Sequence, residues 1–149
     1  HDFAAARRAV EATAARGIAV GAHFILGLPG ESDGELLDRT QTIDALPLTT
    51  VKFHQLQIVE GTRMADLYAA RPELFRRWTP EEYIDLVTEI VRRLRPDIAV
   101  ERIAGQTPPR IRCQRPWGNL RSDVLWRMLE KRLAEKNAYQ GDFFVSSQR

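Results

Sequence analysis

The feature that most constrains the fold is a continuous apolar run that stops at a glycine-rich turn. Residues 18–26 read IAVGAHFIL, and Gly27-Leu28-Pro29-Gly30 follows directly. A run of strand length that is apolar at nearly every position is typical of a parallel sheet, in which both faces of the strand are covered. Ser32 and Glu35 then have the spacing of a capping box, which predicts the start of a helix. The sequence therefore predicts a buried strand that passes through a tight turn into a helix.

Strands and helices alternate along the rest of the chain. Residues 49–59 and 98–105 predict two further strands, and helical patterns precede, separate and follow the three strands. This alternation indicates an α/β fold with a parallel sheet. Three strands rarely complete such a sheet. We therefore expect either a small sheet or the C-terminal half of a larger α/β barrel.

The helix boundaries are marked by capping residues. Asp2 is the expected N-cap of a first helix, Gly61-Thr62 opens a short one, and Thr79 with Glu82 repeats the capping-box pattern. A last amphipathic helix follows a loop at residues 106–122, and the final dozen residues are expected to form a tail.

Charge is distributed unevenly along a chain whose formal net charge is only +2. Residues 1–109 hold 13 basic and 16 acidic side chains, whereas residues 110–149 hold 9 basic and 4 acidic ones. A basic C-terminal quarter is compatible with an anionic partner such as nucleic acid, and also with an ordinary solvated helix face. In the first case Trp117 would stack on a base. The arginines that would contact phosphates are Arg110, Arg112, Arg115 and Arg121.

The glycine turn also has two interpretations. Gly27 lacks a side chain where the strand ends, so a flat ligand could lie against the backbone on the side of the sheet where ligands bind. Alternatively, Gly27 and Gly30 serve only the geometry of a tight strand-to-helix turn. No lysine follows the second glycine, so this is not a phosphate-binding loop.

Two longer stretches resemble a known family. HFILGLPGE and, about thirty residues later, VKFHQLQIVEGTRM are similar to the fifth and sixth strand motifs of radical S-adenosylmethionine (SAM) enzymes. Ile25, Gly27 and Glu31 match the fifth-strand pattern, while His23 stands where the general pattern has glycine. Together with YQG at 139–141, these stretches resemble a bacterial branch of the family with an elongator-protein-3-like core. Some members of that branch are linked to modification of the tRNA wobble uridine.

The resemblance implies a fold and a set of site residues. The expected fold is the C-terminal half of a TIM-type radical SAM barrel over residues 1–105, followed by a basic extension over residues 106–149. The residues implied in binding the adenine and ribose side of SAM are His23, Ile25, Gly27, Leu28, Gly30, Glu31, Gln57, Ile58 and Gly61. Those implied in substrate contact are His54, Glu101, Arg102 and Trp117, each of which a structural role would also explain.

One departure from the family limits what this chain does by itself. The family holds a [4Fe–4S] cluster with three cysteines in the pattern Cys-x-x-x-Cys-x-x-Cys, and the cluster delivers the electron that cleaves SAM. Only Cys113 is present here, so we predict no metal ligand in this chain and no catalysis by it alone. The cluster and an electron donor are expected only for a full-length protein. The simplest explanation is a truncation, with the cluster loop upstream of His1, and the alternative is a degenerate paralogue. An in-frame cysteine motif upstream of His1 would support the enzyme, and a start codon directly before His1 would support a different function.

Two other classes of function remain open on the sequence. One is a non-catalytic α/β module that binds RNA, with tRNA as the candidate partner, through the basic C-terminal quarter. The other is a small-molecule-binding α/β domain without iron chemistry. No apolar run approaches the roughly 20 residues of a membrane span, and a single cysteine fits a reducing compartment, so we expect a cytoplasmic protein without membrane contact.

Overall fold

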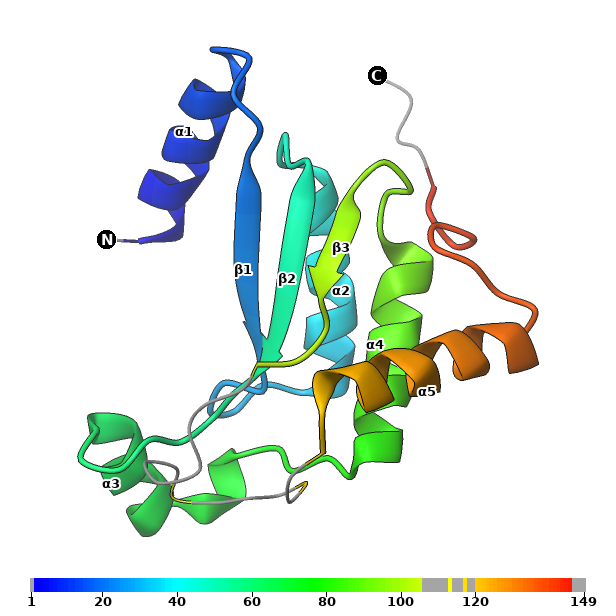
Figure 1. Ribbon diagram of the computed structural model, residues 1–149. Coiled ribbons are helices and arrows are strands. Elements are labelled where there is room, and N and C mark those ends of the chain that lie inside the picture. Colours follow the sequence, from blue (N-terminus) through cyan, green and yellow to red (C-terminus); the bar gives the residue numbers. More distant parts are fainter. Residues whose placement is uncertain (1, 106–112, 114–116, 118–119, 146–149) are drawn as a thin grey trace.

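The computed structural model is a three-stranded parallel sheet with helices packed on one of its faces (Figure 1). It describes residues 2–105, 113, 117 and 120–145. The strands are β1 (Gly21–Leu26), β2 (Thr50–Gln55) and β3 (Ala99–Arg102), in the order β1-β2-β3. The helices are α1 (Phe3–Ala14), α2 (Asp33–Asp44), α3 (Arg63–Ala70), the 3₁₀ turn η1 (Pro72–Leu74), α4 (Pro80–Arg93) and α5 (Ser122–Glu135).

The predicted helix starts are confirmed. The side chain of Asp2 accepts from the Ala5 backbone N–H at 2.8 Å, and Thr62 caps α3 through the N–H of Ala65. Both capping boxes are present, Ser32 with Glu35 on α2 and Thr79 with Glu82 on α4. Each satisfies N–H groups that the first turn of a helix leaves unpaired.

The strands are shorter than predicted, and β1 is less buried. In β1 the exposed positions Gly21, His23 and Ile25 alternate with more buried ones, so only one face of this strand is covered. The apolar run from residue 18 thus does not mark a strand buried on both faces, because helices lie on one side of the sheet only (Figure 1).

The core lies between the sheet and the helices α2 and α4. Val51 and Phe53 of β2 are fully buried there, against an apolar side of α4 that includes Tyr83 and Val87. α5 packs across α4 and buries Leu125 and Leu129 in the same core. The division of the chain at residues 105 and 106 remains a prediction, since residues 106–112 lie outside the described residues.

The two ends of the chain are attached very differently. No residue of α1 is buried, and Phe3 is 55% exposed. Residues 138–145, expected to be a tail, are instead held on α4. The N–H groups of Gly141 and Phe143 donate to the carbonyl oxygens of Val91 and Arg92 of α4 at 3.1 and 2.8 Å. Gln140 Nε2 donates to the carbonyl oxygens of Arg95 and Ile98, just after α4, at 3.0 and 2.7 Å.

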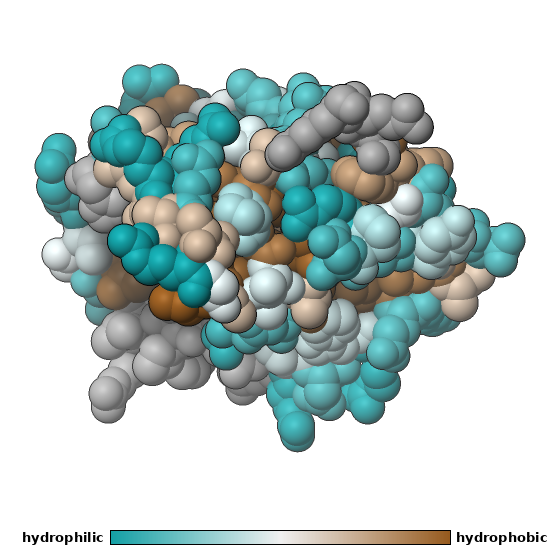
Figure 2. Space-filling model, turned by 90° about the horizontal axis from the view of Figure 1, so that it is seen from above, coloured by the Kyte–Doolittle hydropathy of each residue, from teal (hydrophilic) through white to brown (hydrophobic). Residues whose placement is uncertain are grey.

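The direction of the strands identifies the end of the sheet where a site is expected. The strand arrows point to the lower end of the molecule in Figure 1, where α3 also lies, so the carboxyl ends of all three strands meet there. From the opposite end, hydrophobic residues form a band between hydrophilic margins (Figure 2). Ligands of parallel α/β sheets bind at the carboxyl ends of the strands, which makes the lower edge the place to look for a site.

Candidate functional site at the carboxyl edge of the sheet

The turn after β1 has a defined geometry. The N–H of Glu31 donates to the carbonyl of Leu28 at 3.0 Å, with Pro29 and Gly30 between them and a φ of +84° at Gly30. These features define a type II turn, which favours proline at its second position and requires a positive φ at its third position. The N–H of Gly30 also donates to the carbonyl of Leu74 at 2.8 Å, which ties the turn to η1.

Gly27 is required for a packing reason. Its φ is +84°, and a Cβ placed on it would lie 2.7 Å from two ring carbons of Trp78. The indole thus lies directly against the Cα of Gly27, and its Nε1 donates to Asp33 at 3.1 Å. On this side of Gly27 the missing side chain makes room for a tryptophan. Ligand contact through the exposed backbone of the turn remains a prediction.

Glu31 holds the turn closed. One carboxylate oxygen accepts from the N–H of Leu28 at 2.8 Å, and the other forms an ion pair with Arg39 of α2. The side chain is only 10% exposed. The carboxylate therefore fixes the conformation of the Leu28–Gly30 backbone and leaves the backbone groups of the turn oriented.

The end of β2 joins β3 through two glutamines. Gln57 Nε2 donates to the carbonyl of Gly105 at 2.6 Å, while the Gln55 amide both accepts from the N–H of Gly105 at 2.9 Å and donates to its carbonyl at 3.3 Å. Gly105 is needed because a Cβ there would lie 2.5 Å from His54 Nδ1.

This junction leaves two buried polar atoms without a hydrogen-bond partner among the described residues. They are Gln57 Oε1 and His54 Nε2. Buried polar atoms are almost always paired, and an orphaned one calls for an explanation such as a missing ligand or water. Their placement at the carboxyl edge makes a ligand site the more specific explanation.

The uncovered face of the sheet carries polar side chains. The rings of His23 and His54 stack with centroids 5.5 Å apart, and Lys52 Nζ lies 2.9 Å from a carboxylate oxygen of Glu101. Burial lowers the pKa of His54, and electrostatic interaction with Arg102, His23 and Lys52 lowers it further. Hydrogen bonds from Thr50 and Lys52 hold the pKa of Glu101 below its usual value.

The structure brings most of the predicted site residues to one end of the sheet. Gly27, Leu28, Gly30 and Glu31 form the turn after β1, and Gln57 lies beside Gly105. His23, Ile25 and His54 lie on the uncovered face, where Ile25 is 47% exposed. The carbonyl of Ile58 accepts from the N–H of Cys113, and Gly61, with φ +72°, precedes α3.

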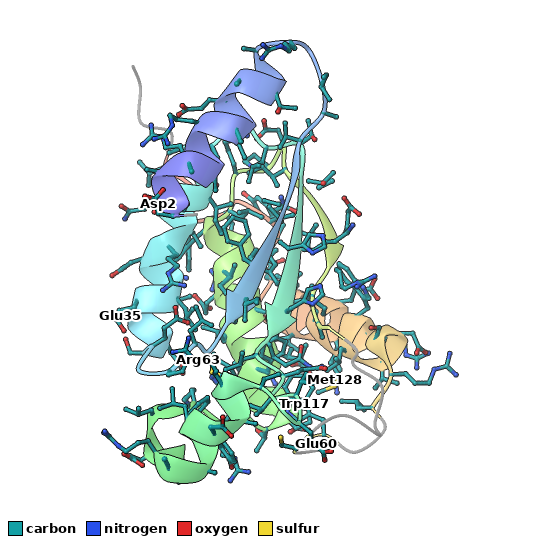
Figure 3. All side chains as sticks on the ribbon, turned by 90° about the vertical axis from the view of Figure 1, so that its left-hand side faces the viewer. Asp2, Glu35, Glu60, Arg63, Trp117 and Met128 are labelled. Carbon is teal, nitrogen blue, oxygen red and sulfur yellow. The ribbon has the colours of Figure 1, made fainter. Side chains whose placement is uncertain are left out.

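Trp117 is engaged in packing. Its ring centroid lies 4.8 Å from that of Tyr83, and its Nε1 donates to the carbonyl of Trp78 at 2.8 Å. Trp117 and Glu60 are both near the carboxyl edge in side view (Figure 3). Substrate contact by Trp117 remains a prediction, and base stacking there would compete with its contact to Tyr83.

Several residues of this edge were not singled out by the sequence. Trp78 and Gly105 lie outside the two stretches that carry the family resemblance, and Lys52 lies within VKFHQLQIVEGTRM but was assigned no role. Glu101 was predicted as a substrate contact or a structural residue, but the alternating polarity of the two strands does not say that it would pair with Lys52.

The basic C-terminal quarter is described only in part. Arg110, Arg112 and Arg115 lie outside the described residues. Arg121 and Arg127 both pair with Asp123, and Arg132 pairs with Asp85 of α4. Where it is described, this segment thus has its cations paired with carboxylates, as on an ordinary solvated face.

No place for the iron–sulfur cluster is found in the part of the chain that the structure describes. That part contains no group of three or more His, Cys, Asp or Glu side chains arranged to hold a metal ion, and its exposed Cys113 is a single thiol. The residues present therefore do not fit a cluster that needs three thiolates. Within the same residues, no helix is both long and apolar enough to cross a membrane.

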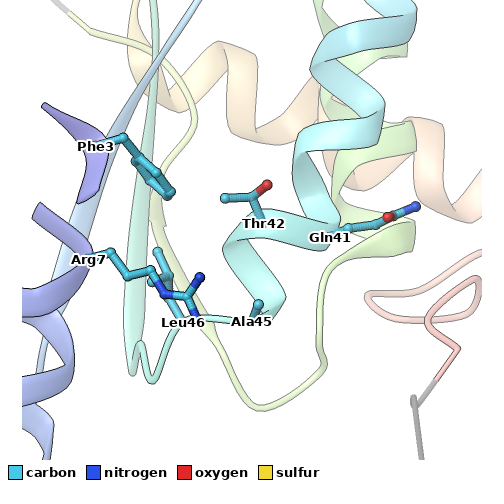
Figure 4. Close-up of a pocket in the computed structure, with 6 residues that line it drawn as sticks. All are labelled: Phe3, Arg7, Gln41, Thr42, Ala45 and Leu46. Atoms are coloured by element: carbon cyan, nitrogen blue, oxygen red, sulfur yellow. The ribbon is translucent and has the colours of Figure 1, made fainter.

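A separate pocket of about 280 Å³ lies between α1 and α2 (Figure 4). Its lining comprises Phe3, Arg7, Gln41, Thr42, Ala45 and Leu46. None of these residues belongs to the carboxyl edge of the sheet, and the pocket reflects the loose attachment of α1.

Comparison with known proteins agrees with this geometry. The sequence model of the protein family described as the radical SAM C-terminal domain matches residues 48–135, more than half of the chain. An uncharacterised protein of Methanocaldococcus jannaschii is 30% identical over 118 residues, which cover 78% of this chain and 36% of that protein. The uncharacterised protein YtqA of Bacillus subtilis is 28% identical over 97% of this chain and 44% of its own length. Protein YhcC of Escherichia coli is 32% identical over 70% of this chain and 33% of its own length.

A solved structure shares the fold. Elp3 of Methanocaldococcus infernus, with its N-terminus deleted, superposes on 94% of this chain with a TM-score of 0.73 at 20% identity. The match covers 32% of the Elp3 chain. This chain thus spans less than half of the length of each of these proteins, from 32% to 44%.

Proposed function

This chain belongs to the radical SAM C-terminal domain family, and from that premise we propose that it supplies the adenine and ribose side of a SAM site. The turn from Gly27 to Glu31 and the Gln57–Gly105 junction would hold the cofactor. The observation that carries the proposal is the pair of buried, unpartnered atoms, Gln57 Oε1 and His54 Nε2, at the end of β2. An amino-substituted ring such as adenine offers both donors and acceptors to such atoms.

The groups present suit a neutral, hydrogen-bonding cofactor site. Because burial and nearby cations lower the pKa of His54, its imidazole is held neutral near pH 7, with one ring nitrogen as donor and the other as acceptor. Gln57 is anchored through its Nε2 to Gly105, so its Oε1 is held in place before any ligand arrives. Such preorganisation reduces the entropy lost on binding.

The chemistry of the cofactor requires parts that this chain lacks. SAM bound to a [4Fe–4S] cluster supplies a 5′-deoxyadenosyl radical. In our proposal the cluster and an electron donor belong to a full-length cytoplasmic protein, and this chain orients the adenosyl end of SAM and contacts the substrate. Modification of the tRNA wobble uridine is the candidate reaction, supported by the sequence resemblance alone.

The test uses S-adenosylhomocysteine, which needs no cluster to present an adenosyl group. We expect its titration into the chain to shift the backbone amide signals of Gly27, Gly30 and Gln57 in heteronuclear NMR spectra. Gln57→Leu should weaken binding at least about fivefold, since a hydrogen bond to a buried acceptor contributes about 1 kcal/mol. Gln41→Leu, on the exposed side of α2, is the matched control and should bind as the parent chain does. Equal binding by both variants would contradict the proposal.

A further inference from the structure

Arg102 faces the uncovered side of the sheet because the pairing of β2 with β3 is irregular. Val51 pairs with Val100, but the next residue, Lys52, pairs with Arg102, so Glu101 is an extra residue in β3. Such a bulge places two consecutive side chains on one face, and bulges are frequent beside active sites, where they redirect side chains. Glu101 does reach Lys52 on the uncovered face, and Ile103 is buried again.

The bulge gives this face an excess of positive charge. The carboxylate of Glu101 is already engaged by Lys52 and by the Thr50 hydroxyl. Arg102 is exposed, and we find no ion pair or hydrogen bond to its side chain within residues 2–105 and the other described positions. The face thus carries two cationic side chains, Lys52 and Arg102, and a single carboxylate.

The histidine pair lies next to these charges. His23 is exposed on β1 and stacks on His54 of β2. The strand register places His23 opposite Lys52 and Lys52 opposite Arg102, so the three residues lie side by side across the sheet, next to His54. The effect of all three on the pKa of His54 agrees with this placement. A barrel interior filled for packing alone would carry branched apolar residues at these positions. A cluster of cationic and imidazole groups is suited to an anion.

We propose that Arg102, His23 and Lys52 form a phosphate-binding subsite on the uncovered sheet face, which receives a phosphate group of the substrate. This inference rests on the proposed function in one respect: the phosphate is taken to belong to the substrate that reacts at the carboxyl ends of the strands. A guanidinium matches a phosphate with two parallel N–H donors, and lysine and imidazole add further donors. That phosphate belongs either to a small phosphorylated molecule or to a nucleic acid.

The experiment titrates inorganic phosphate into the chain at constant ionic strength, with the NMR signals of the Arg102 guanidinium and the His23 ring as readouts. We expect saturable shifts in the parent chain and about tenfold or greater weakening in Arg102→Gln, because a charge-assisted hydrogen bond contributes about 1.5–3 kcal/mol. Arg8→Gln, at an exposed position of α1, is the matched control and should bind as the parent does. Glu101→Gln should bind several-fold more tightly, since it removes a repelling charge.

Equal phosphate binding by the two arginine variants, or shifts that rise linearly without saturation, would overturn the subsite. Where binding is saturable, ribose 5-phosphate and a short oligouridylate, neither of which carries adenine, separate the two sources of phosphate by their relative affinities. The two proposals are tested by different probes and different signals. S-adenosylhomocysteine carries no phosphate, and its signals are those of Gly27, Gly30 and Gln57, so either site can fail while the other stands.

Discussion

The two faces of the sheet carry opposite kinds of side chain on the same strands. Along β2, Val51 and Phe53 point toward the helices and are fully buried, whereas Lys52 and His54, between and after them, point to the uncovered face. Because side chains alternate across a strand, six residues serve two surfaces at once. On β2 the uncovered face thus carries Lys52 and His54 where the covered face carries only apolar side chains. It is therefore a surface suited to lining a site, in contrast to the core on the other side.

The largest expected effect is a difference in stability between substitutions at neighbouring residues that lie on opposite faces of the sheet. Phe53→Ala should lower the free energy of unfolding by about 3–5 kcal/mol, since it leaves a cavity in a fully buried position. Lys52→Ala, one residue earlier, should cost under about 1 kcal/mol because it removes a partly exposed ion pair. Urea denaturation of both variants measures the difference. Similar losses would mean that the uncovered face also supports the fold.

The second expected effect comes from the contact between Trp78 and the turn after β1. Gly27→Ala should cost about 2–5 kcal/mol, the sum of a residue forced to positive φ and a clash with Trp78. Gly30→Ala has the same φ of +84° but nothing within 4 Å of the added Cβ, so it should cost only about 1–2 kcal/mol. Thermal unfolding gives both values. Equal losses would show that Trp78 yields to the added methyl group.

The sequence predicted the order and the starts of the elements well, for local reasons. A capping box such as Ser32–Glu35 or Thr79–Glu82 is complete within four residues, so it can be recognised without the fold. The type of sheet also followed from the alternation of strands and helices. The glycine turn was located correctly, but its partner Trp78 is fifty residues away and could not be foreseen.

Features that depend on contacts between distant segments were missed. The bulge that exposes Arg102 depends on the register between β2 and β3, which no pattern in β3 alone reveals. Residues 138–145 showed no helical or strand period and were expected to be a tail. They are held by contacts to α4 instead, among them Arg92 Nε with both carboxylate oxygens of Asp142, at 3.0 and 3.1 Å.

A third effect measures how much the ion pair of the uncovered face contributes. A double-mutant cycle with Lys52→Met and Glu101→Gln should give a coupling energy below about 1 kcal/mol, because both side chains are partly solvated. The coupling should fall further in about 1 M salt, where the Debye length is only about 3 Å. Denaturation midpoints at two salt concentrations provide the measurement. A larger coupling that salt leaves unchanged would indicate a pair shielded from solvent.

The smallest effect is a pH dependence that comes from His54. Its pKa in the folded chain lies below the ordinary value of 6.5, first because of burial and then because of Arg102, His23 and Lys52. Below pH 6.5 the unfolded chain therefore binds a proton more readily than the folded chain, so folding loses stability as the pH falls from 6.5 through the lowered pKa. In His54→Gln no imidazole is left to bind a proton, so this variant should lack the part of the stability loss that comes from His54. The substitution leaves the core unchanged, because residue 54 lies on the uncovered face and Phe53 on the covered one. Melting temperatures from pH 8 to pH 5 compare the parent chain with the variant. Parallel curves would mean that His54 titrates alike in both states, and that the cations of the uncovered face lie too far from its ring to act on it.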